Sequence, residues 1–86
     1  MVITIMTVAF VLLKITPGKE REVCELLRRV EGVEEVSVIF GKYDIHLRVD
    51  VPSVDELDDF VIDVRRLSKH IQSTTTLVCT DVQEKK

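Results

Sequence analysis

The stretch EEVSVIFGKYDIHLRVDV, residues 34–51, contains two strand patterns separated by a turn signal. In residues 34–40, and again in residues 44–51, aliphatic or aromatic side chains alternate with polar ones. A period of two residues is typical of a strand that buries only one face. Gly41 and Lys42, between the two patterns, indicate a turn. The stretch therefore predicts two antiparallel strands joined by a tight hairpin.

An amphipathic helix is predicted on each side of this hairpin. In residues 17–30 apolar side chains recur at helical spacing, with Thr16 as the expected cap and Gly32 beyond the end. The second helix is expected to begin after Ser53, because Glu56 three residues later completes a capping box. Its apolar stripe comprises Val54, Leu57, Phe60, Val61, Val64 and Leu67.

Two further strands complete the pattern. Residues 6–15 form an apolar run rich in large and β-branched side chains, and residues 72–80 form a last strand. The order strand, helix, strand, strand, helix, strand predicts an α+β, ferredoxin-like βαββαβ fold. Its antiparallel sheet has the expected strand order 4-1-3-2, with both helices on one face. We expect a single domain over residues 1–86, with residues 81–86 as a frayed tail.

Composition narrows the classes of function. The net charge of −3 argues against a large phosphate-binding surface, and the 5% of aromatic residues offer few platforms for stacking bases. The apolar N-terminus, residues 1–13, is shorter than the roughly 20 residues that span a bilayer. The two isolated cysteines favour a reducing, cytoplasmic setting. No direct nucleic-acid or membrane partner is therefore expected.

One face of the predicted sheet is open, and its centre is apolar. The third strand places His46 and Arg48 on this face, opposite the helices. Both the odd-numbered and the even-numbered side chains of the first strand are apolar. Whichever set faces the helices, the other set forms an apolar strip on the open face. Pairing of two sheets face to face is the simplest cover, which predicts a dimer or larger homo-oligomer. The candidates for the dimer interface are Val8, Phe10, Leu12, Ala9 and Val11.

Few side chains suggest catalysis. His46 is the best-placed titratable group, and it is the expected base if the chain is a small dimeric ferredoxin-like enzyme of the isomerase or monooxygenase type. We favour a solvated polar residue beside Arg48, because no Ser, Cys or carboxylate is spaced to complete a catalytic set. A third alternative, an RNA-binding sheet, is disfavoured because it needs several aromatic residues on its central strands, and this chain offers only Phe10 there. Neither a metal site nor a cofactor is predicted.

Two segments together suit a small zwitterion. Residues 41–44, GKYD, offer a glycine turn, an aromatic ring and a carboxylate, and residues 73–76, STTT, offer hydroxyls. An amino acid needs a carboxylate for its ammonium group, and hydroxyl or backbone N–H donors for its own carboxylate. From the pattern alone, residues 41–44 are explained equally well as an ordinary hairpin turn, and residues 73–76 as ordinary β-branched strand residues.

The chain resembles the C-terminal effector domain, or RAM domain, of the leucine-responsive regulatory protein/asparagine-regulator (Lrp/AsnC) family. The resemblance covers about residues 7–80. It rests on a core of spaced valines leading to the G.YD turn, on a helix that opens after VPS, and on the hydroxyl-rich IQSTTTLV. The first two of these features lie in the stretch AFVLLKITPGKEREVCELLRRVEGVEEVSVIFGKYDIHLRVDVPSVDELDDFV.

The resemblance implies a ferredoxin-like domain that dimerises through its sheets, often within octameric or similar rings, and that binds amino-acid effectors between subunits. The chain departs from the family pattern in one respect, because we expect no room in it for the usual N-terminal helix-turn-helix domain. We therefore expect a stand-alone, non-enzymatic sensor that co-assembles with a full-length Lrp/AsnC regulator. The expected ligand residues are those matching the G.YD turn and the last strand, namely Gly41, Tyr43, Asp44, Ser73, Thr74 and Thr76.

Overall fold

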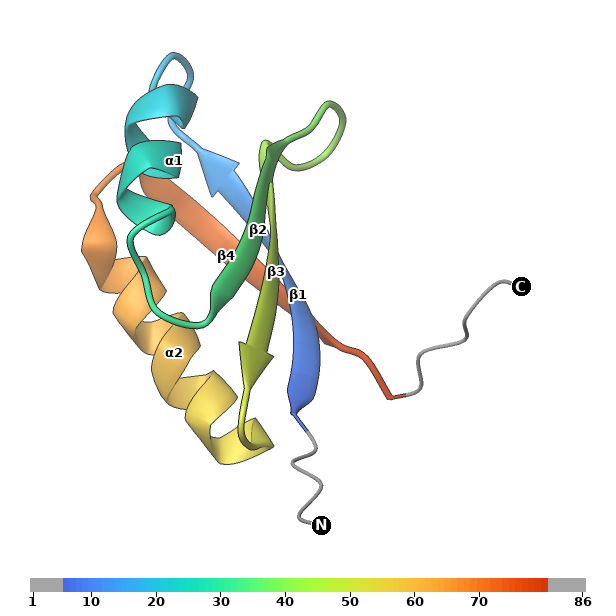
Figure 1. Cartoon of the computed structure of the whole chain (residues 1–86). Coiled ribbons are helices and arrows are strands. Elements are labelled where there is room, and N and C mark those ends of the chain that lie inside the picture. The colour runs from blue at the N-terminus through green and yellow to red at the C-terminus, as the bar shows by residue number, and fades with distance from the viewer. Residues whose placement is uncertain (1–5, 81–86) are drawn as a thin grey trace, which may run out of the picture.

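Two helices cover one face of a four-stranded antiparallel sheet in the computed structural model, which describes residues 6–80 (Figure 1). The spatial order β2-β3-β1-β4 is the predicted order read from the opposite edge, so the ferredoxin-like fold is confirmed. The predictions for residues 1–5 and for the tail 81–86 lie outside the described residues. The elements are β1 (Thr7–Ile15), α1 (Glu20–Leu27), β2 (Val33–Val38), β3 (Ile45–Val51), α2 (Val54–Leu67) and β4 (Ile71–Val78).

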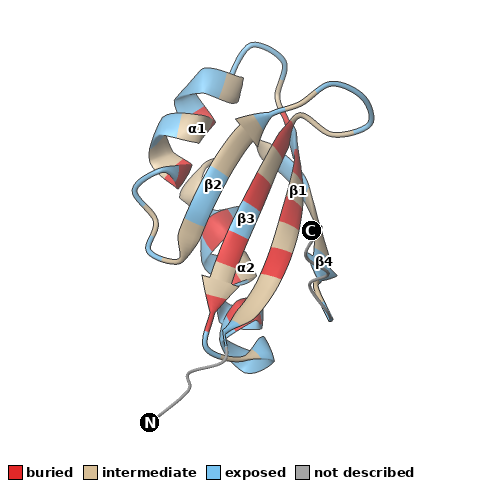
Figure 2. Ribbon diagram, turned by 45° about the vertical axis from the view of Figure 1, so that its right-hand side comes forward, coloured by how far each residue is buried: buried red, intermediate tan, exposed pale blue. Residues whose placement is uncertain are grey.

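The core lies between the sheet and the helices. Alternate residues of β1 and β3 are buried, which gives the banded pattern of Figure 2. Each fully buried valine or leucine side chain stabilises the fold by about 1.5–3 kcal/mol. The core comprises Ala9, Val11, Leu13 and Ile15 of β1, Val23 and Leu27 of α1, Ile45, Leu47, Val49 and Val51 of β3, and Leu57, Phe60 and Val64 of α2.

Helix α2 begins where the sequence predicts. The Oγ of Ser53 accepts a hydrogen bond from the backbone N–H of Glu56 at 3.4 Å. This bond satisfies one of the free N–H groups at the helix start. Acidic Asp55 in the first turn and basic Arg65 in the last turn complement the helix dipole.

Helix α1 is shorter than predicted. It spans residues 20–27 rather than 17–30, and its N-cap Lys19 makes no side-chain capping bond. The reason is Gly18, whose φ of +86° is incompatible with a right-handed helix. Thr16, the expected cap, instead donates its backbone N–H to the carbonyl oxygen of His70 at 2.9 Å. The prediction of Thr16 as a cap is therefore wrong.

The connection between β2 and β3 is a loop of residues 39–44, not the predicted tight hairpin. The backbone N–H of Ile39 donates to the carbonyl oxygen of Asp44 at 2.9 Å and closes the loop. The N–H of Asp44 donates to the carbonyl oxygen of Leu13 in β1, also at 2.9 Å. Asp44 is thereby tied to the neighbouring strand, and the loop around Gly41 extends beyond the sheet (Figure 1).

Candidate functional site

The strand register determines which side chains share the open face. Phe10 of β1 lies opposite Arg48 of β3 and Leu77 of β4. Leu12 lies opposite His46 and Thr75. Cross-strand partners point to the same side of a sheet, and successive residues alternate. We use the name open face for the side chains of Val8, Phe10, Leu12, His46, Arg48, Ser73, Thr75 and Leu77.

The open face corrects the set of candidates for the dimer interface. Ala9 and Val11 are fully buried in the core beneath the helices, so they have no surface with which to contact a second chain. Val8, Phe10 and Leu12 are partly exposed on the other side of the strand. Leu77, which the sequence analysis missed, is 52% exposed beside Phe10. Its position opposite Phe10 follows from register, which the sequence does not reveal.

His46 packs against an aromatic ring. Its imidazole stacks on Phe10, with ring centroids 5.4 Å apart and planes inclined by 26°. On the other side, Ser37 of β2 is its cross-strand partner. Arg48, next on the same face, pairs with Asp50 at 3.6 Å, and both side chains are partly exposed. The imidazole therefore contributes packing at the edge of the apolar strip, an arrangement that suits an interface.

Tyr43 connects the β2–β3 loop to β4. Its hydroxyl lies 3.0 Å from the Oγ1 of Thr75 in β4. Because β1 lies between β3 and β4, the Tyr43 side chain crosses β1 to reach this partner. Thr75 shares the open face with Leu12, so the tyrosine borders one end of the apolar strip. Thr75 was not among the predicted residues, because a continuous run of hydroxyls does not show which of them face which side.

Asp44 makes a structural hydrogen bond. Its Oδ2 accepts the backbone N–H of Ile15 at 2.8 Å. The pairing of β1 with β4 shifts register between Lys14 and Ile15, so the carboxylate bonds to β1 where that ladder is irregular. Among the described residues, Oδ1 of Asp44 has no hydrogen-bond partner. One carboxylate oxygen thus positions the loop relative to β1.

The predicted hydroxyl donors lie on two different faces. Ser73 lies opposite Lys14 on the open face. Thr74 and Thr76 lie opposite Leu13 and Val11, on the side of the helices. Thr76 lines a groove between α2 and β4, while exposed Gly41 lies in the β2–β3 loop. The structure therefore does not bring the six predicted ligand residues together within one chain.

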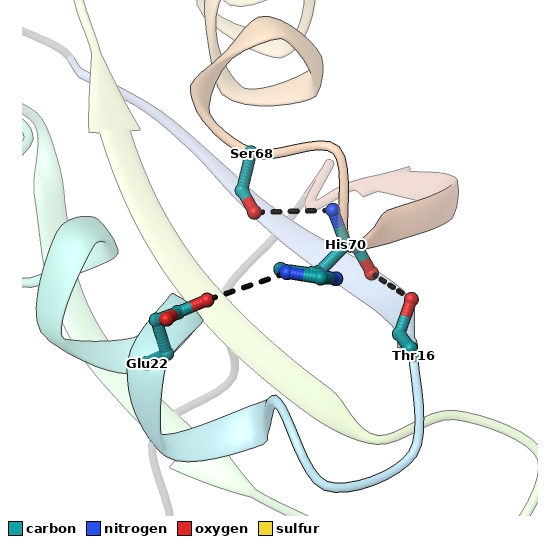
Figure 3. A network of polar contacts seen from close by, with 4 residues as sticks. All are labelled: Thr16, Glu22, Ser68 and His70. Atoms are coloured by element: carbon teal, nitrogen blue, oxygen red, sulfur yellow. Dashed lines mark hydrogen bonds and ion pairs between the residues drawn. The ribbon is translucent and has the colours of Figure 1, made fainter.

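A second polar cluster joins the β1–α1 and α2–β4 connections (Figure 3). His70 Nε2 lies 3.5 Å from Glu22 Oε2, and the backbone N–H of His70 donates to Ser68 Oγ at 3.1 Å. The hydroxyl of Thr16 donates to the carbonyl oxygen of His70 at 3.4 Å. These contacts fix the two connections to each other, which is a structural role.

The cysteines and acidic residues form no evident reactive or metal site in the described part of the chain. Burial raises the pKa of the Cys24 thiol, which lowers the fraction of reactive thiolate at neutral pH. Cys79 is likewise a free cysteine, and its backbone N–H donates to the carbonyl oxygen of Val8 at 2.8 Å. Among residues 6–80, no three histidine, cysteine or acidic side chains converge as metal ligands.

Comparison with known proteins identifies the class to which this fold and this open face belong. The model of the Lrp/AsnC ligand binding domain matches residues 8–85. The chain therefore belongs to the Lrp/AsnC ligand-binding domain family, and the resemblance found in the sequence is confirmed. Neither α1 nor α2 has the length and apolar character needed to cross a membrane.

Similar curated proteins are regulators from Pyrococcus. The uncharacterized HTH-type transcriptional regulator PF1231 of Pyrococcus furiosus is 34% identical over 77 residues, covering 90% of this chain and 52% of the relative. The regulator PH1916 of Pyrococcus horikoshii is 35% identical over 75 residues, covering 84% and 50%. The chain thus spans about half the length of the curated relatives that it matches.

Similar solved structures include proteins of about this length. FFRP-DM1 is 36% identical with a TM-score of 0.80, and the match covers 86% of this chain and 99% of that one. The hypothetical protein PHS023 of Pyrococcus horikoshii is 35% identical with a TM-score of 0.79, covering 92% and 93%. AsnC of E. coli, at 22% identity and a TM-score of 0.85 over 93% of this chain and 54% of that one, shares the fold.

Proposed function

We propose that this domain is a non-enzymatic effector-sensing and oligomerisation module of transcription regulation, and that it dimerises through the open face. The observation that carries the proposal is the apolar centre of that face, where Phe10 and half-exposed Leu77 lie side by side. A second copy packed on the same face removes this surface from water and forms a self-complementary interface. Membership in a ligand-binding domain family supports the sensing role.

An amino acid bound between subunits is the proposed effector. The free Oδ1 of Asp44 binds the ammonium group, and the hydroxyls of Thr74 or Thr76 bind the carboxylate. Gly41, Tyr43 and Ser73 complete the proposed set. Because these residues lie in two places on one chain, a site that uses all of them requires a neighbouring subunit. The effector then favours one assembly by its higher affinity for it.

A regulatory role is favoured over the enzyme hypothesis. The curated relatives are named as transcriptional regulators, and His46, the proposed base of the enzyme alternative, stacks on Phe10 within the surface proposed for dimerisation. We propose that the module acts in the cytoplasm and co-assembles with a full-length Lrp/AsnC regulator. The similarity to regulators that are about twice as long supports this partner.

Native mass spectrometry with and without a mixture of the twenty amino acids tests the proposal. We expect a dimer or a larger homo-oligomer, and an added mass that corresponds to one of the amino acids. The Asp44→Asn variant serves as the matched control, because it keeps an oxygen acceptor for Ile15 while losing the charge. A spectrum without any added mass would contradict the sensing role.

A further inference from the structure

The imidazole of His46 lies on one of the two central strands of the open face. Strand β3 runs between β2 and β1, so His46 has Ser37 as its neighbour on one side and Leu12 on the other. The side chain is half-buried in the single chain and stacks on Phe10. A second copy that covers Phe10 and Leu12 therefore also removes this imidazole from water.

His46 differs from the other histidine of the chain in having no ion-pair partner. The chain contains two histidines, and His70 lies 3.5 Å from the carboxylate of Glu22. Among residues 6–80, His46 forms no ion pair. Histidine is the side chain whose charge changes between about pH 5 and pH 8. In the single chain, a charge on His46 therefore depends on water for its solvation.

The charged groups next to His46 on its own chain segment are engaged elsewhere. Arg48, two residues further along the open face, lies 3.6 Å from Asp50. The carboxylate of Asp44, two residues before His46, accepts the backbone N–H of Ile15. The nearest cation on β3 thus has the same sign as a protonated imidazole, and the carboxylates on either side have other partners.

The neighbouring elements supply no counter-ion in contact with the imidazole. Glu35 of β2 lies opposite Arg48 and accepts a hydrogen bond from the hydroxyl of Ser37 at 3.5 Å. On β1, Lys14 is a further exposed cation on the open-face side, opposite Ser73. The β2–β3 loop contributes Tyr43, and a phenol is uncharged between about pH 5 and pH 8. A proton on the imidazole therefore adds a charge that the described chain does not pair.

We propose, on the basis of the proposed open-face dimer, that His46 makes this dimer sensitive to pH: the interface accepts the neutral imidazole, and protonation separates the subunits. Covering a charge that has no partner costs free energy because the charge loses its hydration. His46 therefore takes up its proton more readily in the single chain than in the dimer. By linkage, the dimer is strongest above the pH range in which histidine titrates, and it weakens as the pH falls through that range. The stack on Phe10 does not change this sign, because it forms within one chain and is common to both states.

Sedimentation equilibrium over a series of concentrations, at about pH 8 and about pH 5.5, tests the proposal. The dissociation constant of the parent dimer is expected to rise about tenfold or more at the lower pH, because each dimer contains two copies of His46. His46→Phe keeps a ring against Phe10 and His46→Gln keeps a polar side chain, and neither carries a charge. Each of these variants is expected to change its dissociation constant by less than about twofold between the two pH values.

His70→Gln is the matched control, because it removes the other histidine, whose partner Glu22 belongs to helix α1 and not to the open face. It is expected to keep the pH dependence of the parent. The proposal is overturned if the parent dimer is equally strong or stronger at the lower pH, or if His46→Phe and His46→Gln weaken as the parent does. It is also overturned if circular dichroism shows that the parent unfolds at the lower pH. A parent that is monomeric already at about pH 8 contradicts the open-face dimer itself, so the two failures are distinguishable.

Discussion

The Tyr43 hydroxyl and the Thr75 Oγ1 lie 3.0 Å apart and join the β2–β3 loop to β4 across the intervening strand β1. This hydrogen bond connects the two segments, GKYD and STTT, that were predicted from sequence to bind a ligand. It does so through Thr75, on the open face, and not through the predicted Thr74 or Thr76. The bond therefore sets the position of the loop relative to the proposed dimer interface.

Replacing either partner of this bond is expected to destabilise the chain. Tyr43→Phe and Thr75→Val should each lower the free energy of unfolding by about 0.5–1.5 kcal/mol, the usual net contribution of one hydrogen bond. The double variant should lose less than the sum of the two, because the single variants remove the same bond. Denaturant unfolding measures all four proteins, and strictly additive losses would show that the two groups do not interact.

Asp44 is expected to have separable structural and ligand-binding roles. Asp44→Ala leaves the Ile15 N–H without its acceptor and should reduce both stability and amino-acid affinity. Asp44→Asn keeps an oxygen acceptor and should retain most of the stability, while affinity falls about tenfold or more, which corresponds to about 1.5–3 kcal/mol for a charged hydrogen bond. Calorimetry with the amino acid found by mass spectrometry measures this. Unchanged affinity in Asp44→Asn would refute the ammonium contact.

Gly18 is expected to resist replacement for backbone reasons alone. Its φ is +86°, and a Cβ placed there would meet no atom within 4 Å. Gly18→Ala should therefore lower the free energy of unfolding by about 1–2 kcal/mol through left-handed strain without any steric clash. Gly18→Asn should lose less, because asparagine adopts this region more readily. Equal stability of all three chains by thermal unfolding would be inconsistent with the strain.

Cys24 is expected to react slowly with thiol reagents. Burial raises the pKa of its thiol above the ordinary value of 9.0, so at any pH below that value less thiolate is present in the folded chain than in the unfolded chain. In a Cys79→Ser background, alkylation of Cys24 should be slower in buffer than in denaturant, and should accelerate as the pH rises past 9.0. Equal rates in the two solvents would contradict protection by burial.

The periodicity of β3 was sufficient to predict both its conformation and its faces, because Ile45, Leu47 and Val49 alternate with polar residues. The faces of β1 were not predictable in this way. Both phases of the strand are apolar, and only its register with β3 shows that Val11 faces the helices while Phe10 faces outward. When the side chains on both faces of a strand are apolar, the sequence does not show which set packs under the helices and which set lies on the open face.

The loop and the hydroxyl run show a second limit of sequence patterns. Gly41-Lys42 indicates a turn, yet the turn's length depends on Asp44 bonding to β1, a contact between residues distant in sequence. Likewise Ser73 and Thr74 look equivalent in the sequence, and the pairing of β4 with Lys14 and Leu13 places them on opposite faces. Short-range patterns predict the elements, whereas contacts across the sheet decide which side chains meet.

The dimer proposal makes a direct prediction for Leu77. This residue is half-exposed beside Phe10, and a lysine there would place a charge in the centre of the proposed interface. Leu77→Lys should therefore separate the subunits. Ile62→Lys is the matched control, because Ile62 is a similarly exposed apolar residue on α2, away from the open face.

Sedimentation equilibrium of the parent chain and these two variants tests the central claim most directly. The account predicts that the parent and Ile62→Lys sediment with at least twice the 9.8 kDa mass of one chain, and that Leu77→Lys shifts toward 9.8 kDa. A parent chain that sediments as a 9.8 kDa particle at micromolar and higher concentrations would contradict the claim that a second copy covers the open face.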